Sequence, residues 1–410
     1  MTAQAAAEQA PIDEDPFADP DHALRLVAPH MRQVPLENLA KLAHMSEGIE
    51  NLIPLWYGQG DLVTPHFIRD AAKQALDEGF TFYVPRQNGL LELTESLSRY
   101  MTRLHGREIS NDRITITQGG MQAIFSAIQM VAGPGNRVVY LEPHWPNVKG
   151  ASRVVGADLQ AVRMRVGNDG WYVDLQELMD ACTPETKAIF FSSPANPMGW
   201  IMPREQQRAL LDFCRERGIW ILEDAVYDRL VFTGANCAPS LLDLAEPEDP
   251  VLAINTFSKT WAMTGWRIGW LTHPPSCAPL LSAITQYTNS GITSFVQKAA
   301  VTAVDHGESW VHEVRNRCKH GRDLAVEGLS QIDRAVLPKV PEGGMYVFFR
   351  IEGMDDSREA CEKILKESGV GLAPGWFFGP GAESFIRLCT FRDPKDIETA
   401  MDRLKTLLVS

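Results

Sequence analysis

The sequence predicts an α/β fold of three layers, a mostly parallel sheet between helices, followed by a smaller α+β domain. Two observations predict this fold. From about residue 64 onward, short apolar runs alternate with amphipathic segments, and that alternation is typical of parallel strands joined by helices. After about residue 300 it gives way to one long polar helix pattern and two isolated strand-like runs, as expected of an α+β unit.

Five short runs rich in β-branched and aromatic residues are the expected strands of the sheet. Each run ends where a polar or Gly-rich segment begins. Ligands of open α/β sheets gather at the carboxyl ends of the strands, so we look for chemistry directly after these runs. The runs are residues 113–117, 137–141, 188–193, 218–224 and 251–257.

Helices are expected between the strands, for example over 120–132 and 203–218. The second has Pro203 near its start and Gly218 at its end, which are the positions that helix termini favour for these residues. The elements expected in the last part of the chain are a helix over 308–332 and strands over 343–351 and 384–391. The expected organisation is a flexible tail (1–16), an N-terminal segment joining the small domain (17–60), a large domain (61–297) and a small C-terminal domain (298–410).

Composition excludes several classes of function. The 410 residues can bury a substantial core, and the net charge of -13 argues against nucleic acid or an anionic membrane as a partner. Seven cysteines without any CxxC pair argue against a disulfide framework or a metal cluster. We find no signal peptide in the first sixteen residues and no apolar run of about 18 residues. We therefore expect a cytoplasmic protein that acts on small molecules.

Lys259 directly follows the strand expected at 251–257. Most lysines are solvated surface charges, but this one is flanked by Phe257 and Trp261. Partial desolvation would lower its pKa and produce a nucleophilic amine suited to Schiff-base chemistry. The nearby hydroxyls of Thr256 and Ser258, with Arg267 between two glycines, could complete a phosphate site.

Three other strand ends carry candidate groups. Asp224 ends the run at 218–224; it could cap a helix, or face a pyridine nitrogen beside a Schiff-base lysine. Asn196 lies in SSPANPMG, which could simply be a rigid turn, and its amide could donate to a phenolate oxygen. Gly119 and Gly120 open the helix that begins near Met121, and backbone amides at such a position favour a phosphate.

Two further residues have two interpretations each. Trp145, before a proline at a strand end, could pack in the core or stack on a pyridine face. Arg387 lies within a strand-like run. It could occupy an exposed face of that strand, or clamp a substrate carboxylate with two hydrogen bonds.

With these residues assembled, the chain resembles the fold-type I pyridoxal-phosphate enzymes, specifically the class I and II aminotransferases. Several spaced motifs in one order are far more specific than any single one. They run over about 350 residues: GQGD (58–61), FYVPRQNG (82–89), TQGGMQA, EPHWP, SSPANPMG, EDAVYD, TFSKTWAMTGWRIG, PEGGMYVFF and SFIRL. Met198 and Gly60 depart from the residues usual in two of these motifs, and neither has a side-chain role assigned here.

The resemblance implies a role for each candidate. Lys259 would bind pyridoxal 5'-phosphate as an aldimine and then move the substrate's Cα proton, and the cofactor would pass through a pyridoxamine-phosphate form. Asp224 would pair with the ring nitrogen, Asn196 and Tyr227 with the phenolate oxygen, and Trp145 would stack on the ring. The implied phosphate site is Gly119, Gly120, Met121, Thr256, Ser258 and Arg267. Arg387, Asn196 and the backbone of Gly58 would bind the substrate, and Tyr83 would reach the neighbouring site of a homodimer.

We expect amino transfer between an amino acid and a 2-oxo acid. A β- or γ-lyase with the same residues is the main alternative, because the reaction depends on which Cα bond is broken. A non-catalytic effector-binding module is disfavoured, because the N-terminal tail is too short for a DNA-binding domain. An aromatic or large apolar substrate side chain is expected rather than a strong preference for aspartate. The residues that suggest it are Trp56, Tyr57, Phe82, Trp145, Trp376 and Phe377.

Overall fold

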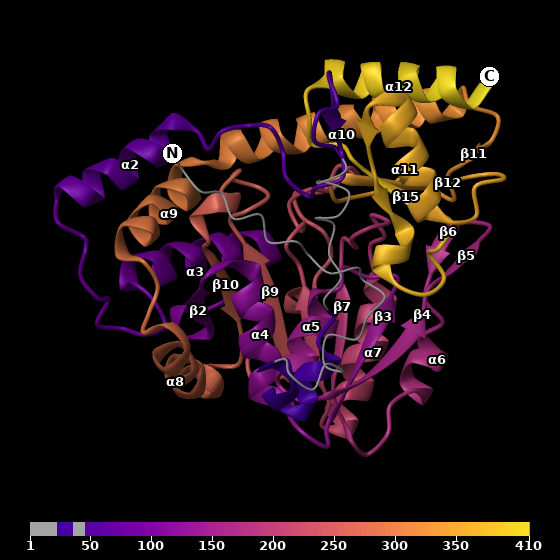
Figure 1. Ribbon diagram of the computed structural model, residues 1–410. Helices are drawn as coiled ribbons and strands as arrows, with labels where there is room; N and C mark the ends of the chain where they lie inside the picture. The colour runs from indigo at the N-terminus through magenta and orange to yellow at the C-terminus, as the bar shows by residue number, and fades with distance from the viewer. Residues whose placement is uncertain (1–22, 36–45, 410) are drawn as a thin grey trace.

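The computed structural model describes residues 23–35 and 46–409, so the predicted tail at 1–16 lies outside the described residues. Its centre is a seven-stranded sheet in the order β2-β10-β9-β8-β7-β3-β4, covered by helices on both faces (Figure 1). Only β10 runs antiparallel to its neighbours β2 and β9 among these seven strands. The predicted α/β class with a mostly parallel sheet is therefore confirmed.

The five strands predicted for this sheet are all present, with bounds that differ by one or two residues. They are β2 (Ile114–Thr117), β3 (Arg137–Glu142), β7 (Thr186–Ser192), β8 (Trp220–Asp224) and β9 (Val251–Thr256). The other two strands of this sheet were not predicted. The edge strand β4 (Asp158–Arg163) has polar residues on its exposed positions, and β10 (Gly269–Thr272) lies directly after the Gly-rich segment around Arg267.

Most helices of the first three hundred residues pack on the two faces of this sheet, whereas α2 packs on α9 and α6 packs on α7. The face formed by Tyr140, Phe190 and Leu222 shares one apolar cluster with α4, α5 and α8, whereas Leu141, Phe191 and other residues of opposite orientation pack with α3, α7 and α9. These helices are α2 (His66–Asp77), α3 (Leu91–His105), α4 (Gly119–Val131), α5 (Asn147–Val154), α6 (Leu175–Asp180), α7 (Arg204–Arg217), α8 (Ala278–Asn289) and α9 (Ser294–His306).

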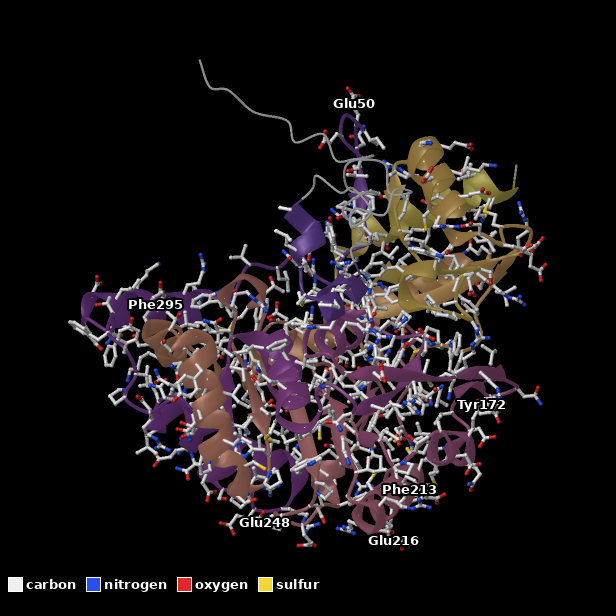
Figure 2. All side chains as sticks on the ribbon, turned by 60° about the horizontal axis from the view of Figure 1, so that its bottom comes forward. Glu50, Tyr172, Phe213, Glu216, Glu248 and Phe295 are labelled. Carbon is white, nitrogen blue, oxygen red and sulfur yellow. The ribbon has the colours of Figure 1, made fainter. Side chains whose placement is uncertain are left out.

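Both of the helices predicted between strands are confirmed as α4 and α7. Pro203 precedes α7, and Gly218 ends it in the left-handed conformation with its N–H bonded to the carbonyl oxygen of Cys214. Figure 2 shows the side chains that fill the space between the sheet and its helices, with Phe213 and the exposed Glu216 both on α7. The described helices include none that is long and apolar enough to cross a membrane.

The last part of the chain forms a second unit around the four-stranded sheet β11-β12-β15-β14. The long α10 runs along the top of the molecule towards this unit, where α12 packs beside it (Figure 1). The elements are α10 (Glu308–Ser330), β11 (Ala335–Val336), β12 (Tyr346–Ile351), α11 (Ser357–Ser368), β13 (Val370–Gly371), β14 (Ala373–Pro374), β15 (Phe385–Cys389) and α12 (Pro394–Val409). The predicted helix and both predicted strands are thus present.

Short elements complete the chain. Strand β1 (Ile53–Pro54) pairs in parallel with β13, which ties the N-terminal segment to the C-terminal unit. The predicted domain bounds themselves stay a prediction. The remaining elements are the β5 (Arg165–Gly167) and β6 (Gly170–Tyr172) hairpin and the 3-10 turns η1 (Ala23–Leu26), η2 (Pro29–Gln33), η3 (Asn111–Arg113), η4 (Leu241–Asp243), η5 (Thr264–Trp266), η6 (Pro275–Cys277) and η7 (Gly375–Phe378).

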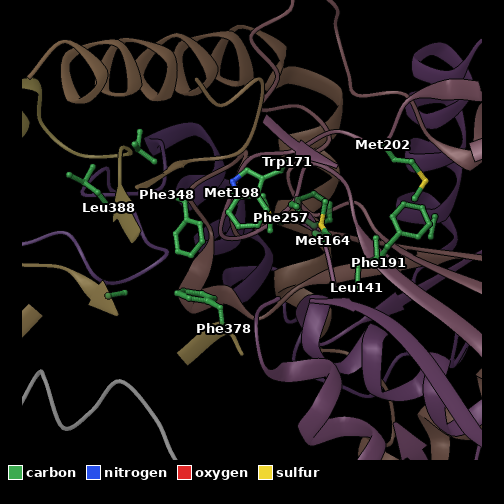
Figure 3. Packing of buried hydrophobic residues seen from close by; sticks show 14 of the residues in the cluster. Leu141, Met164, Trp171, Phe191, Met198, Met202, Phe257, Phe348, Phe378 and Leu388 are labelled. Atoms are coloured by element: carbon green, nitrogen blue, oxygen red, sulfur yellow. The ribbon is translucent and has the colours of Figure 1, made fainter. Parts of the chain in front are cut away.

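One apolar cluster joins the two units. Trp171 of β6 packs with ring centroids 6.0 Å from Phe348 and 5.2 Å from Phe385, and Figure 3 shows Phe348, Phe378 and Trp171 in this contact region. Large aromatic side chains bury much apolar surface away from water in this contact. The contact therefore fixes how the C-terminal strands lie against the central sheet. The two units together therefore define the cavity described next.

Candidate active site

A cavity of about 410 Å³ opens at the carboxyl ends of β3, β7, β8 and β9, where the sequence predicts the chemistry. Most of the predicted site residues line it, whereas Gly119, Arg387 and Tyr83 do not. The predicted residues on its surface are Gly58, Gly120, Met121, Trp145, Asn196, Asp224, Tyr227, Thr256, Ser258, Lys259 and Arg267.

Lys259 follows β9 and has the environment that the sequence predicts. Phe257 and Trp261 on either side of it are buried, with ring centroids 4.8 Å apart. The Nζ atom donates a hydrogen bond to the carbonyl oxygen of Gly58 at 2.7 Å. Burial lowers the pKa of Lys259 to about 8, because a charged amine loses its hydration in the interior. About a tenth of the Lys259 side chains are therefore neutral and nucleophilic at pH 7, and this fraction rises with pH.

Asp224 is the last residue of β8, and its side chain is buried. Burial raises the pKa of this carboxyl to about 7. The hydrogen bond it accepts, from the backbone N–H of Val226 at 3.3 Å, is a long one, and the residues that follow form a turn rather than a helix. Asp224 is therefore a buried acid without a close cationic partner among the described residues, and a protonated ring nitrogen would stabilise its charge.

The predicted phosphate residues converge on the first turn of α4. Thr256 Oγ1 lies 3.0 Å from Ser258 Oγ, and Arg267 donates to Ser258 Oγ at 3.5 Å and to the carbonyl oxygen of Thr264 at 2.7 Å. A Cβ atom on Gly119 would lie 2.5 Å from Arg267 Nη2, so Gly119 makes room for the guanidinium from behind the cavity surface. A helix N-terminus, an arginine and two hydroxyls form a site suited to a phosphate.

Arg387 lies on β15 and is fully buried, so the interpretation as an exposed-face arginine is wrong. It donates from Nη1 to Asn196 Oδ1 at 2.9 Å and from Nη2 to the carbonyl oxygen of Trp56. The hydrogen bond from Arg387 Nη1 occupies the amide oxygen of Asn196. The NH₂ group of Asn196, which lines the cavity, is left as a donor. Because the guanidinium has no exposed surface, a carboxylate can reach it only when neighbouring side chains move.

Trp145 packs against a neighbouring aromatic ring and also reaches the cavity, and its stacking on a pyridine face stays a prediction. Its ring packs against Phe377 with centroids 5.3 Å apart, and the residue also lines the cavity. Tyr83, by contrast, is 85% exposed and lies with Phe82 in a separate hollow. The fold therefore does not bring Tyr83 to the cavity of its own chain.

Of the six residues that suggested an aromatic or large apolar substrate, only two line the cavity. Tyr57 and Trp145 line the cavity, Trp56 is buried beside Arg387, and Phe377 packs on Trp145. Trp376 lies instead under the guanidinium of Arg358, whose central carbon is 4.9 Å from the centroid of the Trp376 ring. Phe82 lies outside the cavity with Tyr83.

Sequence reasoning missed two groups with clear contacts in the site. Tyr346 lines the cavity and its hydroxyl lies 2.9 Å from that of Tyr227; its motif was recognised, but a tyrosine that begins a strand of the second sheet carries no strand-end signal. His144 is buried at the end of β3, with Nδ1 2.7 Å from the carbonyl oxygen of Trp145. Burial lowers the pKa of His144 to about 4, so it is neutral at neutral pH.

Comparison with known proteins identifies the family. The model of the family described as aminotransferase class I and II matches residues 51–404. The chain belongs to this family. An aspartate aminotransferase of Thermotoga maritima is 30% identical over 94% of this chain and 100% of its own, and an aromatic-amino-acid aminotransferase of Thermococcus litoralis is 31% identical over 90% and 95%. The crystal structure of the Thermotoga maritima enzyme covers 94% of this chain and 100% of its own with a TM-score of 0.86.

Members of the class I and II aminotransferase family use pyridoxal 5'-phosphate, and this chain is an aminotransferase that depends on this cofactor. The residues present fit that group. A partly buried amine with a lowered pKa, a buried carboxylate without a close cationic partner among the described residues, and a phosphate site at a helix N-terminus all meet in one cavity. The substrates of such an enzyme are an amino acid and a 2-oxo acid.

Proposed function

We propose that this aminotransferase uses Lys259 as the residue that binds the cofactor and moves the proton of the substrate's Cα. When bound, pyridoxal phosphate supplies an electrophilic carbonyl carbon for an amine and a ring that withdraws electrons from Cα. The observation that carries the proposal is the position of Lys259 on the cavity surface, with Nζ 2.7 Å from the carbonyl oxygen of Gly58, where burial lowers its pKa. A neutral amine is both the nucleophile and the base that this reaction needs.

Asp224, Asn196 and Tyr227 would hold the ring. An ionised Asp224 keeps a ring nitrogen protonated, because the pair of charges stabilises both groups in a buried site. The NH₂ group of Asn196, whose oxygen is bonded to Arg387, and the hydroxyl of Tyr227 would donate to the ring oxygen. Trp145 would cover one face of the ring.

The cofactor phosphate would lie at the start of α4. Arg267 would supply the charge, Thr256 and Ser258 the hydroxyl groups, and the backbone amides at the start of α4, where Gly120 lines the cavity, further donors. Gly119 and Met121 would act through their backbone. Because α4 is held by apolar contacts on the sheet, this anchor would stay fixed while the substrate exchanges.

Arg387, with Asn196 and the backbone of Gly58, would bind the substrate's α-carboxylate. The guanidinium is already hydrogen-bonded to Asn196 and to the carbonyl oxygen of Trp56. Its burial implies that binding there is coupled to movement of the side chains around it. Movement of that kind would open the guanidinium to the carboxylate.

A homodimer with Tyr83 at the neighbouring site is part of the proposal, together with a cytoplasmic location. Three aromatic residues, Phe82, Tyr83 and Tyr287, are each more than 80% exposed. Large aromatic side chains on the surface of a single chain are typical of a surface that a partner covers. The family's enzymes are typically dimers.

The proposed amino donor has an aromatic or large apolar side chain. Tyr57, Trp145 and Ile124 line the cavity, and its lining cations are Lys259 and Arg267, both already assigned, within the described residues. The relatives' names divide between aspartate, aromatic amino acids and others. A screen of amino donors with 2-oxoglutarate and pyruvate tests the proposal: we expect phenylalanine or leucine to exceed aspartate in kcat/KM, and the reverse order would contradict it.

A further inference from the structure

We propose that Tyr346 is a positioning residue of this active site, whose hydroxyl directs the Tyr227 proton towards the ring oxygen of the cofactor and whose ring orients Arg387. The inference rests on the proposed function, in which Tyr227 donates to that oxygen and Arg387 binds the substrate carboxylate. It adds a residue that links these two roles.

Tyr346 contacts three parts of the site at once. It begins β12 opposite Cys389 of β15, is 2% exposed, and lines the cavity. Its hydroxyl lies 2.9 Å from the Tyr227 hydroxyl, and its ring centroid lies 4.2 Å from the guanidinium carbon of Arg387. A Cβ atom on Gly58 would lie 2.1 Å from the same hydroxyl, so Gly58 leaves room for it.

The number of protons on the two tyrosines sets the direction of their hydrogen bond. Burial raises the pKa of Tyr346 to about 12 and that of Tyr227 well above its ordinary value, so both hydroxyls keep their proton at neutral pH. A phenol has one proton to donate. When Tyr227 donates its hydrogen bond to the ring oxygen of the cofactor, Tyr346 must be the donor in the hydrogen bond between the two tyrosines. A hydroxyl that accepts a hydrogen bond becomes a stronger donor.

Charged and titratable groups surround this pair on several elements. They are Arg387 and Cys389 on β15, Asp224 at the end of β8, Cys318 on α10 and Lys259 after β9. Arg387 and Lys259 are the cations among them. Both cations attract the electrons of the tyrosine oxygens and ring faces. The site can therefore hold a series of hydrogen-bond donors that ends on a negatively charged ring oxygen of the cofactor.

The ring of Tyr346 acts separately from its hydroxyl. Stacking on the flat face of a guanidinium leaves the N–H groups at its edges free to form hydrogen bonds. Arg387 uses two of these edges on Asn196 and on the carbonyl oxygen of Trp56, and Phe378 covers it at 4.8 Å. The rings therefore fix the plane in which a carboxylate can meet the remaining N–H groups.

The test is Tyr346→Phe in the holoenzyme, which removes the hydroxyl and keeps the ring. The readout is the pH midpoint at which the cofactor's visible absorbance changes, which reports the proton on the Lys259 nitrogen. Without the Tyr346 hydroxyl, Tyr227 is a weaker donor to the ring oxygen of the cofactor. More negative charge then stays on that oxygen and stabilises the proton on the Lys259 nitrogen. We expect the midpoint to rise by about half a unit to one unit, and KM for the amino donor to change by less than about twofold because the ring remains.

Further variants isolate the coupling. Tyr227→Phe is expected to raise the midpoint further, and Tyr346→Phe added to it is expected to cause no additional rise, because the bond is already lost. Gly58→Ala, which displaces the Tyr346 hydroxyl without removing it, is expected to raise the midpoint as well. Tyr140→Phe is the matched control: it removes a buried hydroxyl bonded to Glu142 outside the cavity and is expected to leave the midpoint unchanged.

An unchanged midpoint in Tyr346→Phe, or an equal rise when it is added to Tyr227→Phe, would overturn the inference and leave the proposed function intact. A wild-type protein that shows no visible cofactor band would overturn the proposed function, and the inference with it.

Discussion

The Nζ atom of Lys259 donates a hydrogen bond to the carbonyl oxygen of Gly58, at a distance of 2.7 Å and across 201 positions of the chain. The bond places the N-terminal segment over the amine. A neutral amine can donate such a bond and still present its lone pair, so the contact orients Lys259 without requiring its charge. Its reactivity is then set by the protonation state.

The first prediction concerns the pH at which the cofactor-free protein takes up pyridoxal phosphate. Burial lowers the pKa of Lys259 to about 8, and only the unprotonated amine attacks a carbonyl. The uptake rate should therefore rise with pH, reach half of its maximum near pH 8 and level off above about pH 9, with about a tenth of the maximal rate at pH 7. Stopped-flow absorbance measures it. A rate that keeps rising to pH 10 would mean that the amine is an ordinary solvated lysine.

The second prediction compares two adjacent buried carboxylates. Asp224→Asn should lower kcat by about two to three orders of magnitude, because a neutral amide cannot stabilise a protonated ring nitrogen. Glu223→Gln is the control, because Glu223 does not line the cavity and instead accepts hydrogen bonds from the Ser240 hydroxyl and the Leu241 backbone N–H. Steady-state kinetics with a thermal melt of each variant decides the matter. Equal losses of kcat in both would argue against a specific role for Asp224.

The third prediction concerns Gly119, which stands behind the phosphate site. Gly119→Ala would place a Cβ atom 2.5 Å from Arg267 Nη2 and strain a backbone with φ of +79°. Cofactor affinity should fall by about tenfold. Gly135→Ala is matched to it, because φ is +80° there and no atom lies within 4 Å of the added Cβ. Equilibrium dialysis of both variants measures the effect, and a similar affinity for the two would show that Arg267 is not displaced.

The fourth prediction concerns Tyr83, which is exposed and distant from the cavity of its own chain. Tyr83→Ala and Lys259→Ala, each expected to be inactive alone, are unfolded, mixed and refolded together. If Tyr83 serves the neighbouring subunit, each mixed dimer has one complete site, and activity should return to about a quarter of the wild-type level when subunits pair at random. Continued inactivity of the mixture, with dimers present by size-exclusion chromatography, would place Tyr83 elsewhere.

Much of the fold could be predicted because strand ends and helix ends carry local signals. Pro203 and Gly218 mark the ends of α7 in the sequence, and the structure has them there. The strand β4 was missed because its exposed edge carries polar residues, which weakens the apolar run used to recognise a strand. The strand β10 was missed because glycines around Arg267 look like a loop.

The candidate site was predictable to the extent that its groups stand at strand ends. Lys259 and Asp224 follow β9 and end β8, where the fold concentrates ligand contacts. Tyr346 could not be found in this way, because it approaches the cavity from the other sheet and its role depends on contacts with Tyr227 and Arg387. The burial of Arg387 is likewise a property of packing between the two units, which no local pattern encodes.

The most direct test of the central claim is to identify the lysine that carries the cofactor. The holoenzyme is reduced with borohydride, which fixes the bond between the cofactor and the amine, and is then digested and mapped by mass spectrometry. We expect the pyridoxyl group on Lys259, and its absence after Lys259→Ala. A pyridoxyl group on a different lysine of the wild-type protein, or on none, would contradict the assignment of Lys259.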